Sequence, residues 1–230
     1  MNQTAGHATG SAARPRLLNL SPLAQLRAGR MPLRLTQLFV GLTLYGLSIA
    51  LMIHGGLGAM PWDVLHVGLA GRLPFAIGVI MVSVSILVLL AWMPLRQMPG
   101  LGTIANALWI GVAADIVLRL LPVAAGLPWQ LAYMGSGIVL NALATAMYIG
   151  SQLGPGPRDG LMTGISRVTG RSLRLARTAI EVVVVAAGWL LGGVVGVGTL
   201  LYAVAVGPLT QFFLPYLTIA LEVPEATEEP

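Results

Sequence analysis

A stretch rich in Gly, Pro and Asp occurs twice in this chain, at residues 57–68 and again at 153–164. The two copies are offset by 96 positions, the distance in sequence that separates Asp63 from Asp159. Glycines on both sides of the motif recur at the same offset, namely Gly41 and Gly137, Gly102 and Gly198, and Gly111 and Gly207. Self-similarity at a fixed period predicts an internal repeat, so the chain consists of two copies of one unit.

Within each copy, the residues around the aspartate interrupt one helix and start another. Gly and Pro before the aspartate prevent an incoming helix from continuing, and Pro61 and Pro157 have the φ angle that the first position of a new helix requires. Asp63 and Asp159 then fall in the first turn, where a carboxylate meets unpaired N–H groups and the positive end of the helix dipole. Each copy is therefore expected to contain a short broken or re-entrant helical hairpin.

The remainder of the chain is mostly apolar. Hydrophobic residues make up 56% of the sequence and charged residues 9%, and the mean hydropathy is +0.83. This composition is typical of multi-spanning membrane proteins. We expect an all-α membrane protein with six transmembrane helices, three in each copy, each near the ~20 apolar residues that a bilayer requires. The expected spans are 35–53, 75–93, 103–121, 129–149, 175–191 and 197–217.

The spans divide the chain into four parts. Residues 1–34 form an arginine-rich cytoplasmic arm that we expect to be disordered or to lie on the surface, and residues 218–230 form an acidic, disordered tail. Between them lie the first repeat, 35–122, and the second repeat, 129–217. The first apolar run is longer than the apolar region of a signal peptide and follows a long arginine-bearing leader. It is predicted to remain in the protein as a signal anchor.

The arginines predict the orientation in the membrane. If both termini are cytoplasmic, the inner side receives the leader, Arg96 and the arginines of the loop 158–174, whereas the outer side keeps Arg72 and Arg119. An odd number of spans per copy then turns the second copy upside down relative to the first. Inverted repeats whose broken helices meet near the midplane are a recurring design of secondary transporters.

Ionisable residues inside spans are costly and are functional candidates by default. Asp115 lies about 18 Å into the third expected span at 1.5 Å per residue, and Arg119 follows at i+4, where the two can pair. In the fifth expected span, Glu181 follows Arg177 at the same spacing. Two interpretations remain open for these residues: static ion pairs that hold helices together, or a relay for protons or substrate.

The charged residues of the repeated motif also have two interpretations. Asp63 and Asp159 are either helix caps or groups that combine capping with a gate on each side. Arg158 is suited to an anionic lipid headgroup or to an anionic substrate. His54 and His66 flank the first motif, and a solvated or capping role is favoured for both over that of a pH switch.

Signatures of enzymes and of cofactor sites are missing from the sequence. It has no GxSxG, no HExxH and no P-loop, and no paired histidines stand with a carboxylate on one helical face. Cysteine is absent, which excludes disulfides and thiolate metal sites. We therefore expect no enzymatic activity, no cofactor, no metal and, since the arginines flank apolar spans, no nucleic-acid partner.

Several motifs in a fixed order resemble the YczE/YyaS/YitT family of bacterial integral membrane proteins. They are GLGAMPWDVL at 56–65, GTIAN at 102–106, GPRDGLM at 156–162, Arg177 with Ile180 and Glu181, and GVGTL at 196–200. The resemblance covers about residues 35 to 217. It implies a protein of the bacterial inner membrane, from a family of uncharacterised membrane proteins that are sometimes grouped with small-molecule or antibiotic exporters. The family supplies no assigned ligand residues, although Asp63, Asp115, Asp159, Arg177 and Glu181 match its motif positions.

The leading functional hypothesis is a secondary transporter that exports a small organic molecule, coupled to protons through Asp115 or Glu181. Its partners are then the lipid bilayer, an unidentified substrate and, where the protein self-associates, further copies of this chain. One alternative is a substrate-capture subunit that depends on an energising partner. The other is a scaffold or regulator that transports nothing.

Overall fold

The computed structural model describes residues 17, 18 and 20–221, and all regular secondary structure in this part of the chain is helical. The helices are α1 (Pro22–Arg27), α2 (Met31–Gly55), α3 (Pro61–Ala70), α4 (Ile77–Leu90), α5 (Leu101–Leu120), α6 (Leu127–Gly150), α7 (Pro157–Thr169), α8 (Leu173–Leu190) and α9 (Val197–Leu217). The prediction of an all-α protein is confirmed.

Four of these helices, α2, α5, α6 and α9, are long and apolar enough to cross a membrane. The apolar helix α4 has 14 residues, so it extends about 21 Å, less than the ~30 Å of a hydrocarbon core. Helix α8 has 18 residues but carries Arg174, Arg177 and Glu181. By length and composition, four helices of the described residues qualify as membrane spans, whereas the sequence predicted six.

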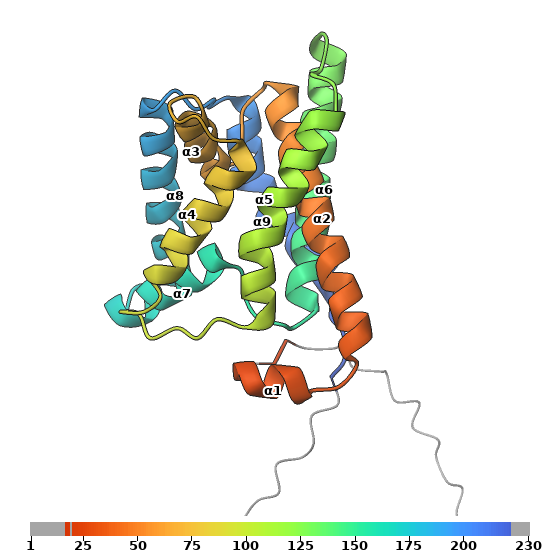
Figure 1. Cartoon of the computed structure of the whole chain (residues 1–230), viewed down its shortest axis with the longest axis vertical. Coiled ribbons are helices and arrows are strands. Elements are labelled where there is room, and N and C mark those ends of the chain that lie inside the picture. The colour runs from red at the N-terminus through yellow and green to blue at the C-terminus, as the bar shows by residue number, and fades with distance from the viewer. Residues whose placement is uncertain (1–16, 19, 222–230) are drawn as a thin grey trace, which may run out of the picture.

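The helices pack in two groups. In the first, α2 packs against α5 and α6, and α6 packs against α9 around buried residues such as Leu42 and Ile49. In the second, α3 and α7 each pack against α4 and α8, and Trp62, Val88 and Val184 form a smaller core. Figure 1 shows α3 near one end of the molecule and α7 near the other, with α1 beyond the α7 end. The two short helices of the repeated motif therefore enter the bundle from opposite ends.

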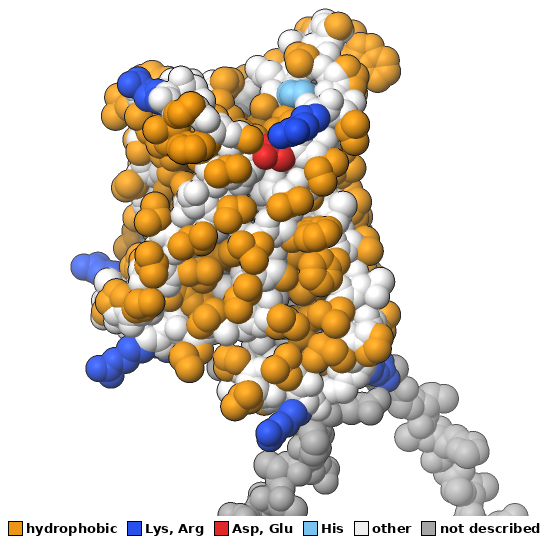
Figure 2. All heavy atoms as spheres, viewed as in Figure 1, with side chains coloured by type: hydrophobic (Ala, Val, Ile, Leu, Met, Phe, Trp, Pro, Cys, Tyr) orange, Lys and Arg blue, Asp and Glu red, His pale blue; other side chains and the backbone are white. Residues whose placement is uncertain are grey.

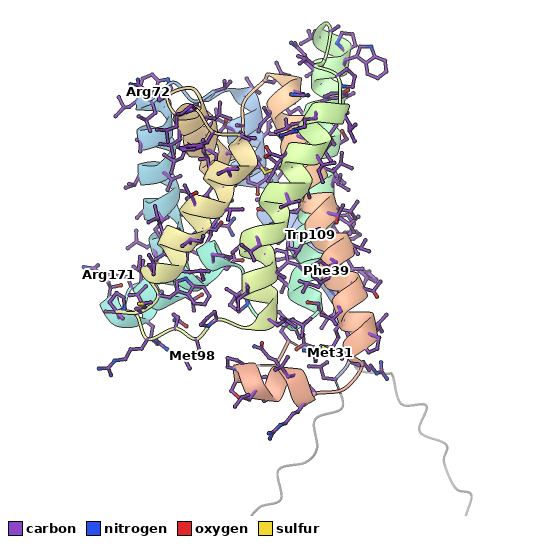
Figure 3. The ribbon with its side chains drawn as sticks, viewed as in Figure 1. Met31, Phe39, Arg72, Met98, Trp109 and Arg171 are labelled. Atoms are coloured by element: carbon purple, nitrogen blue, oxygen red, sulfur yellow. The ribbon has the colours of Figure 1, made fainter. Side chains whose placement is uncertain are left out.

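The outer surface of the bundle is apolar. Hydrophobic side chains cover the middle of the face shown in Figure 2, and the basic side chains lie toward its ends. Val112 and Val204 are 47% and 76% exposed. Phe39 and Trp109, labelled in Figure 3, pack edge to face at 5.2 Å on the outer side of α2 and α5. An exposed apolar area of this extent suits contact with lipid rather than water.

Part of the arm that we expected to be disordered is helical. Ser21 caps α1 by accepting a hydrogen bond from the Ala24 N–H at 3.3 Å, and α2 begins at Met31 rather than at residue 35. The prediction of disorder is therefore wrong for the residues of α1 and for the first turn of α2. Residues 1–16, and the acidic residues of the tail from 222 onward, lie outside the described residues.

Arg34 explains why this segment is ordered. The side chain is completely buried and donates to the Ser151 and Gln152 carbonyl oxygens at 2.9 and 2.7 Å. It also donates to the Gln25 carbonyl in α1. A buried guanidinium needs such acceptors to offset its desolvation, so Arg34 joins α1 to the turn between α6 and α7.

Candidate functional site

The first turn of the repeated motif is held by the start of α9. Gly58 has φ +125°, a conformation that L side chains rarely adopt, and a Cβ atom there would lie 2.7 Å from Thr199 Oγ1. The Gly198 N–H donates to the Leu57 carbonyl at 2.8 Å, and the Thr199 hydroxyl donates to the Ala59 carbonyl at 2.7 Å. The backbone leading into α3 is thus fixed by the second half of the chain.

The second turn is held in the same way by the start of α5. Gly154 has φ +117°, and a Cβ atom there would lie 2.9 Å from Thr103 Oγ1. The Gly102 N–H donates to the Leu153 carbonyl at 2.7 Å, and the Thr103 hydroxyl donates to the Pro155 carbonyl at 2.7 Å. Each of these residues stands 96 positions from its counterpart in the first turn. The two halves therefore hold each other's interrupted helices by equivalent contacts.

Both short helices begin where the sequence predicts. Pro61 and Pro157 occupy the first positions of α3 and α7, and Asp63 and Asp159 lie in the first turns. Proline loses no hydrogen bond at this position, because the N–H groups of a first turn have no intrahelical acceptor. The prediction of an interrupted helix with an acidic first turn is confirmed in both copies.

At the start of α3, Asp63 and His66 form a completely buried pair. Both residues are 0% exposed, and His66 Nδ1 lies 2.9 Å from Asp63 Oδ1. Burial lowers the pKa of His66 below its ordinary value of 6.5, because the loss of solvent disfavours the imidazolium more than the Asp63 carboxylate favours it. His66 is thus neutral near pH 7. Of the two roles that the sequence favoured for this histidine, solvated or capping, the solvated one is wrong because His66 is completely buried.

Three polar atoms of this cluster have no hydrogen-bond partner within the described part of the chain. They are Trp62 Nε1, Asp63 Oδ2 and His66 Nε2, and all three are buried. Buried polar groups are normally satisfied, so three unsatisfied atoms in one cluster mark it as a candidate site for a proton or a ligand.

The start of α7 meets the start of α3 across the interior. The Arg158 guanidinium carbon lies 4.9 Å from the centre of the Trp62 ring, a cation–π geometry. Beside it, the Tyr148 hydroxyl donates a short hydrogen bond to Asp159 Oδ2. Trp62 and Arg158 occupy equivalent positions of the two motif copies. The two interrupted segments therefore touch each other, rather than lying apart on the surface.

Helix α8 adds an ion pair to this region. Arg177 Nε donates to Glu181 Oε1 at 2.9 Å, with side-chain exposures of 48% and 21%. This i,i+4 pair has the spacing that the sequence indicated. The pair faces the meeting point of α3 and α7 and adds a positive and a negative group there.

These side chains surround a cavity of about 60 Å³, which we call the central cavity. Its lining combines charged groups with aromatic rings from five helices. The lining residues are Tyr45, Met60, Pro61, Trp62, Arg158, Asp159, Met162, Arg177, Glu181 and Tyr202. Four of the seven residues singled out in the sequence, Arg158, Asp159, Arg177 and Glu181, line it, and Asp63 directly follows Trp62 in α3.

Asp115 and Arg119 lie elsewhere. Asp115 Oδ1 accepts a hydrogen bond from the Gly78 N–H at 2.8 Å, and Asp115 lines a separate hollow of about 210 Å³ between α4 and α5. Arg119 is exposed, and no ion pair joins it to Asp115 in the described residues. The expected pairing is wrong because the open first turn of α4 offers N–H groups that attract the carboxylate.

A larger hollow of about 540 Å³ opens at the α1 end, and we call it the vestibule. Leu18 and Gln25 line it on the side of the N-terminal segment, and Arg96 and Arg167 line it on the other side. Asp159 lines both the vestibule and the central cavity. The hydrogen-bonded carboxylate of Asp159 therefore stands between the two spaces.

Sequence reasoning missed the polar side chains that support the central cavity from within the spans. The Asn141 side-chain amide donates to Ser48 Oγ at 2.9 Å and accepts from the Tyr202 hydroxyl at 2.8 Å. Asn141 and Ser48 are completely buried. A polar residue in the middle of an apolar span was the available signal, because such groups need partners inside the protein.

Taken together, the helical fold, the apolar exterior and the buried polar centre define an integral membrane protein of the all-α class. A family model described as "Family of unknown function (DUF6198)" matches residues 32–215. The chain belongs to this family.

Three known proteins are similar to this chain. An uncharacterized protein of Haemophilus influenzae (strain ATCC 51907 / DSM 11121 / KW20 / Rd) is 37% identical over 187 residues, covering 81% of this chain and 86% of the relative. The uncharacterized membrane protein YczE of Bacillus subtilis (strain 168) is 32% identical, with coverages of 80% and 86%. The uncharacterized protein YyaS of the same organism is 29% identical, with coverages of 76% and 90%. The resemblance to YczE and YyaS is thereby confirmed, and no solved structure matches the chain.

Proposed function

We propose that this chain is a secondary transporter of the bacterial inner membrane that exports a small organic molecule in exchange for, or together with, protons. The observation that carries the proposal is the central cavity, where charged side chains of α7 and α8 meet the start of α3 inside an apolar bundle. Charged groups at such a depth are expensive and mark substrate or ion pathways.

The proposed architecture is six crossings arranged as two inverted three-helix repeats. The contacts at Gly58 and Gly154 support it, because equivalent residues of the two halves make them. The entry of α3 and α7 from opposite ends supports it as well (Figure 1). In this proposal α4 and α8 complete the crossings, with their short lengths extended by the turns at their ends.

The proposed orientation places both chain ends in the cytoplasm. The side chain of Gln152 accepts from the Leu18 N–H and donates to the Ile219 carbonyl, so the residues before α1 and after α9 lie at one end. Arg171 lies at that end in Figure 3, and Arg72 lies at the other. Cytoplasmic loops carry the excess of arginine, which assigns the α1 end to the inside.

Transport in this scheme alternates between access from the vestibule and access from the opposite side. Asp159 borders both the vestibule and the central cavity, and its hydrogen bond with Tyr148 holds the inner barrier closed. Of the two carboxylates expected to carry protons, Glu181 lines the central cavity and Asp115 does not. Movement of α3 and α7, whose starts both border the cavity, then opens one side at a time.

Efflux from proteoliposomes tests the proposal and identifies the substrate in the same measurement. Vesicles loaded with a bacterial metabolite extract receive an imposed pH gradient, and mass spectrometry identifies the solutes that leave. We expect a small set of solutes to leave in a gradient-dependent manner with the native protein, and to be retained with Asp159→Asn. Arg174→Gln, an exposed residue away from the cavity, is the matched control. Identical efflux from protein-free vesicles for every solute would refute the transporter, and binding without efflux would favour the capture subunit.

A further inference from the structure

The charged groups of the central cavity are unequally satisfied. Each carboxylate has a donor: Asp63 pairs with His66, Asp159 accepts from Tyr148, and Glu181 accepts from Arg177. Arg158 is different, because it stacks on the face of Trp62 and makes no hydrogen bond or ion pair with the described residues.

The Arg158 guanidinium is partly buried and lines the central cavity, and no oxygen among the described residues accepts a hydrogen bond from it, so its N–H groups are available to a ligand in the cavity. Arginine presents five N–H donors, which match the oxygens of a carboxylate or a phosphate in pairs. Stacking on Trp62 occupies the face of the guanidinium and leaves its edge available. We propose that Arg158 is the binding residue for a small oxyanion in the central cavity, and that its occupancy is linked to a proton on the Asp63–His66 pair. This inference deepens the proposed function, on which it rests, by assigning the substrate an anionic class.

Further features of the central cavity support an anion there. Trp62 is 7% exposed, and its indole N–H has no partner among the described residues, so the ring that stacks on Arg158 carries an unused donor. The first turns of α3 and α7 both border the cavity and add the positive ends of two helix dipoles. The volume of about 60 Å³ exceeds the about 10–15 Å³ that one water needs and suits a ligand with few non-hydrogen atoms.

The link to protons follows from the charges around His66. His66 Nδ1 lies 2.9 Å from Asp63 Oδ1 in the same helix, and Arg158 of α7 stacks at 4.9 Å on Trp62, the residue directly before Asp63. Helix α4 carries no titratable residue, and the cavity-lining charges of α8, Arg177 and Glu181, are bonded to each other. The positive charge of Arg158 opposes protonation of His66. An anion bound to Arg158 neutralises this positive charge, so anion binding favours proton uptake by His66. By reciprocity, acid pH raises the affinity for the anion.

Binding is measured with acetate and inorganic phosphate by calorimetry, on the full-length protein in nanodiscs of phosphatidylcholine. We expect acetate to bind, Arg158→Gln to weaken binding about tenfold or more, and Arg158→Lys to retain part of it. Arg174→Gln, which removes an exposed arginine of α8, leaves binding unchanged. Absence of binding by the native protein, or equal binding by Arg158→Gln, overturns the anion site.

A second nanodisc composition distinguishes the source of the oxyanion. If the natural occupant is a lipid phosphate, discs containing phosphatidylglycerol compete, and acetate binds more weakly than in phosphatidylcholine alone. If the occupant is a solute, acetate affinity is equal in both discs. Either result supports an oxyanion at Arg158.

The proton link is measured by repeating the calorimetry in buffers of different ionisation enthalpy and across pH 8 to 6. We expect the protein to take up protons when acetate binds, and its affinity for acetate to rise toward acid pH by up to about tenfold per pH unit. Both effects should be lost in His66→Gln and in Asp63→Asn. Equal affinity at all pH values in the native protein overturns the link, whether or not the variants fold. Because none of these measurements needs flux, the two proposals can fail separately. Acetate binding together with efflux equal to that of protein-free vesicles for every solute would refute the transporter and leave the anion site standing.

Discussion

Replacing Gly58 by alanine tests the idea that the two halves of the chain lock each other's turns. Gly58 has φ +125°, and an added Cβ atom would lie 2.7 Å from Thr199 Oγ1 and 2.8 Å from the Gly196 backbone nitrogen. The second contact is with backbone, which cannot rotate out of the way. The alanine must therefore displace the turn from the start of α9 or adopt a strained conformation.

The cost of Gly58→Ala follows from two contributions. A non-glycine residue in a sparsely populated backbone region costs about 1–3 kcal/mol, and overpacking at a rigid contact costs about 1–3 kcal/mol. Together they amount to about 2–6 kcal/mol. In a domain of this size about 1 kcal/mol corresponds to about 2–4 °C, so we expect the unfolding temperature to fall by at least about 4 °C.

Thermal unfolding of the detergent-solubilised protein, followed by tryptophan fluorescence, measures this shift. Gly154→Ala, with φ +117° in the second turn, is expected to show a similar loss. The control is Gly135→Ala, because a Cβ atom there meets nothing within 4 Å and alanine favours a helix over glycine by about 1 kcal/mol. An unfolding temperature of Gly58→Ala equal to that of the native protein would refute the reasoning.

Three further predictions concern buried polar groups. The pKa of His66 lies below 6.5 in the folded protein, so the unfolded chain binds the proton more readily. Stability should therefore decrease as the pH falls below about 6.5. Thermal melts from about pH 7.5 to 5 should show this slope, and His66→Gln should flatten it. Arg34→Gln leaves the buried carbonyls of Ser151 and Gln152 without their charged donor. It should lower the free energy of unfolding, measured with a chemical denaturant, by about 3 kcal/mol. An unchanged denaturation midpoint would argue against the docking of α1. Trp92→Phe removes the 2.9 Å hydrogen bond to the carbonyl at the start of α7; we expect a loss of about 1 kcal/mol and faster hydrogen exchange in α7, and equal exchange would contradict it.

The local structure of the motif could be predicted because it depends on neighbouring residues alone. Pro61 and Pro157 start helices since their backbone geometry is set by their own rings, and Asp63 and Asp159 fall in the first turns by spacing. The apolar helices α2, α5, α6 and α9 could also be predicted, because length and composition suffice to identify them as candidate spans.

The pairing of charges could not be predicted from spacing. Asp115 and Arg119 have the same i,i+4 relation as Arg177 and Glu181, yet the second pair forms and the first does not form among the described residues. The difference arises from Gly78, 37 residues before Asp115, whose backbone N–H reaches the carboxylate. Helix spacing shows which partners are possible, and tertiary packing decides among them.

The sequence by itself determined the membrane-protein class, the two interrupted helices and the residues at their starts, since these depend on composition and on local backbone geometry. The tertiary structure alone decided that Trp62 meets Arg158, that His66 is buried and that Asp159 stands between two cavities. These facts depend on which helices lie side by side. Contacts between residues far apart in the chain are set by the packing of whole helices, and no local pattern encodes them.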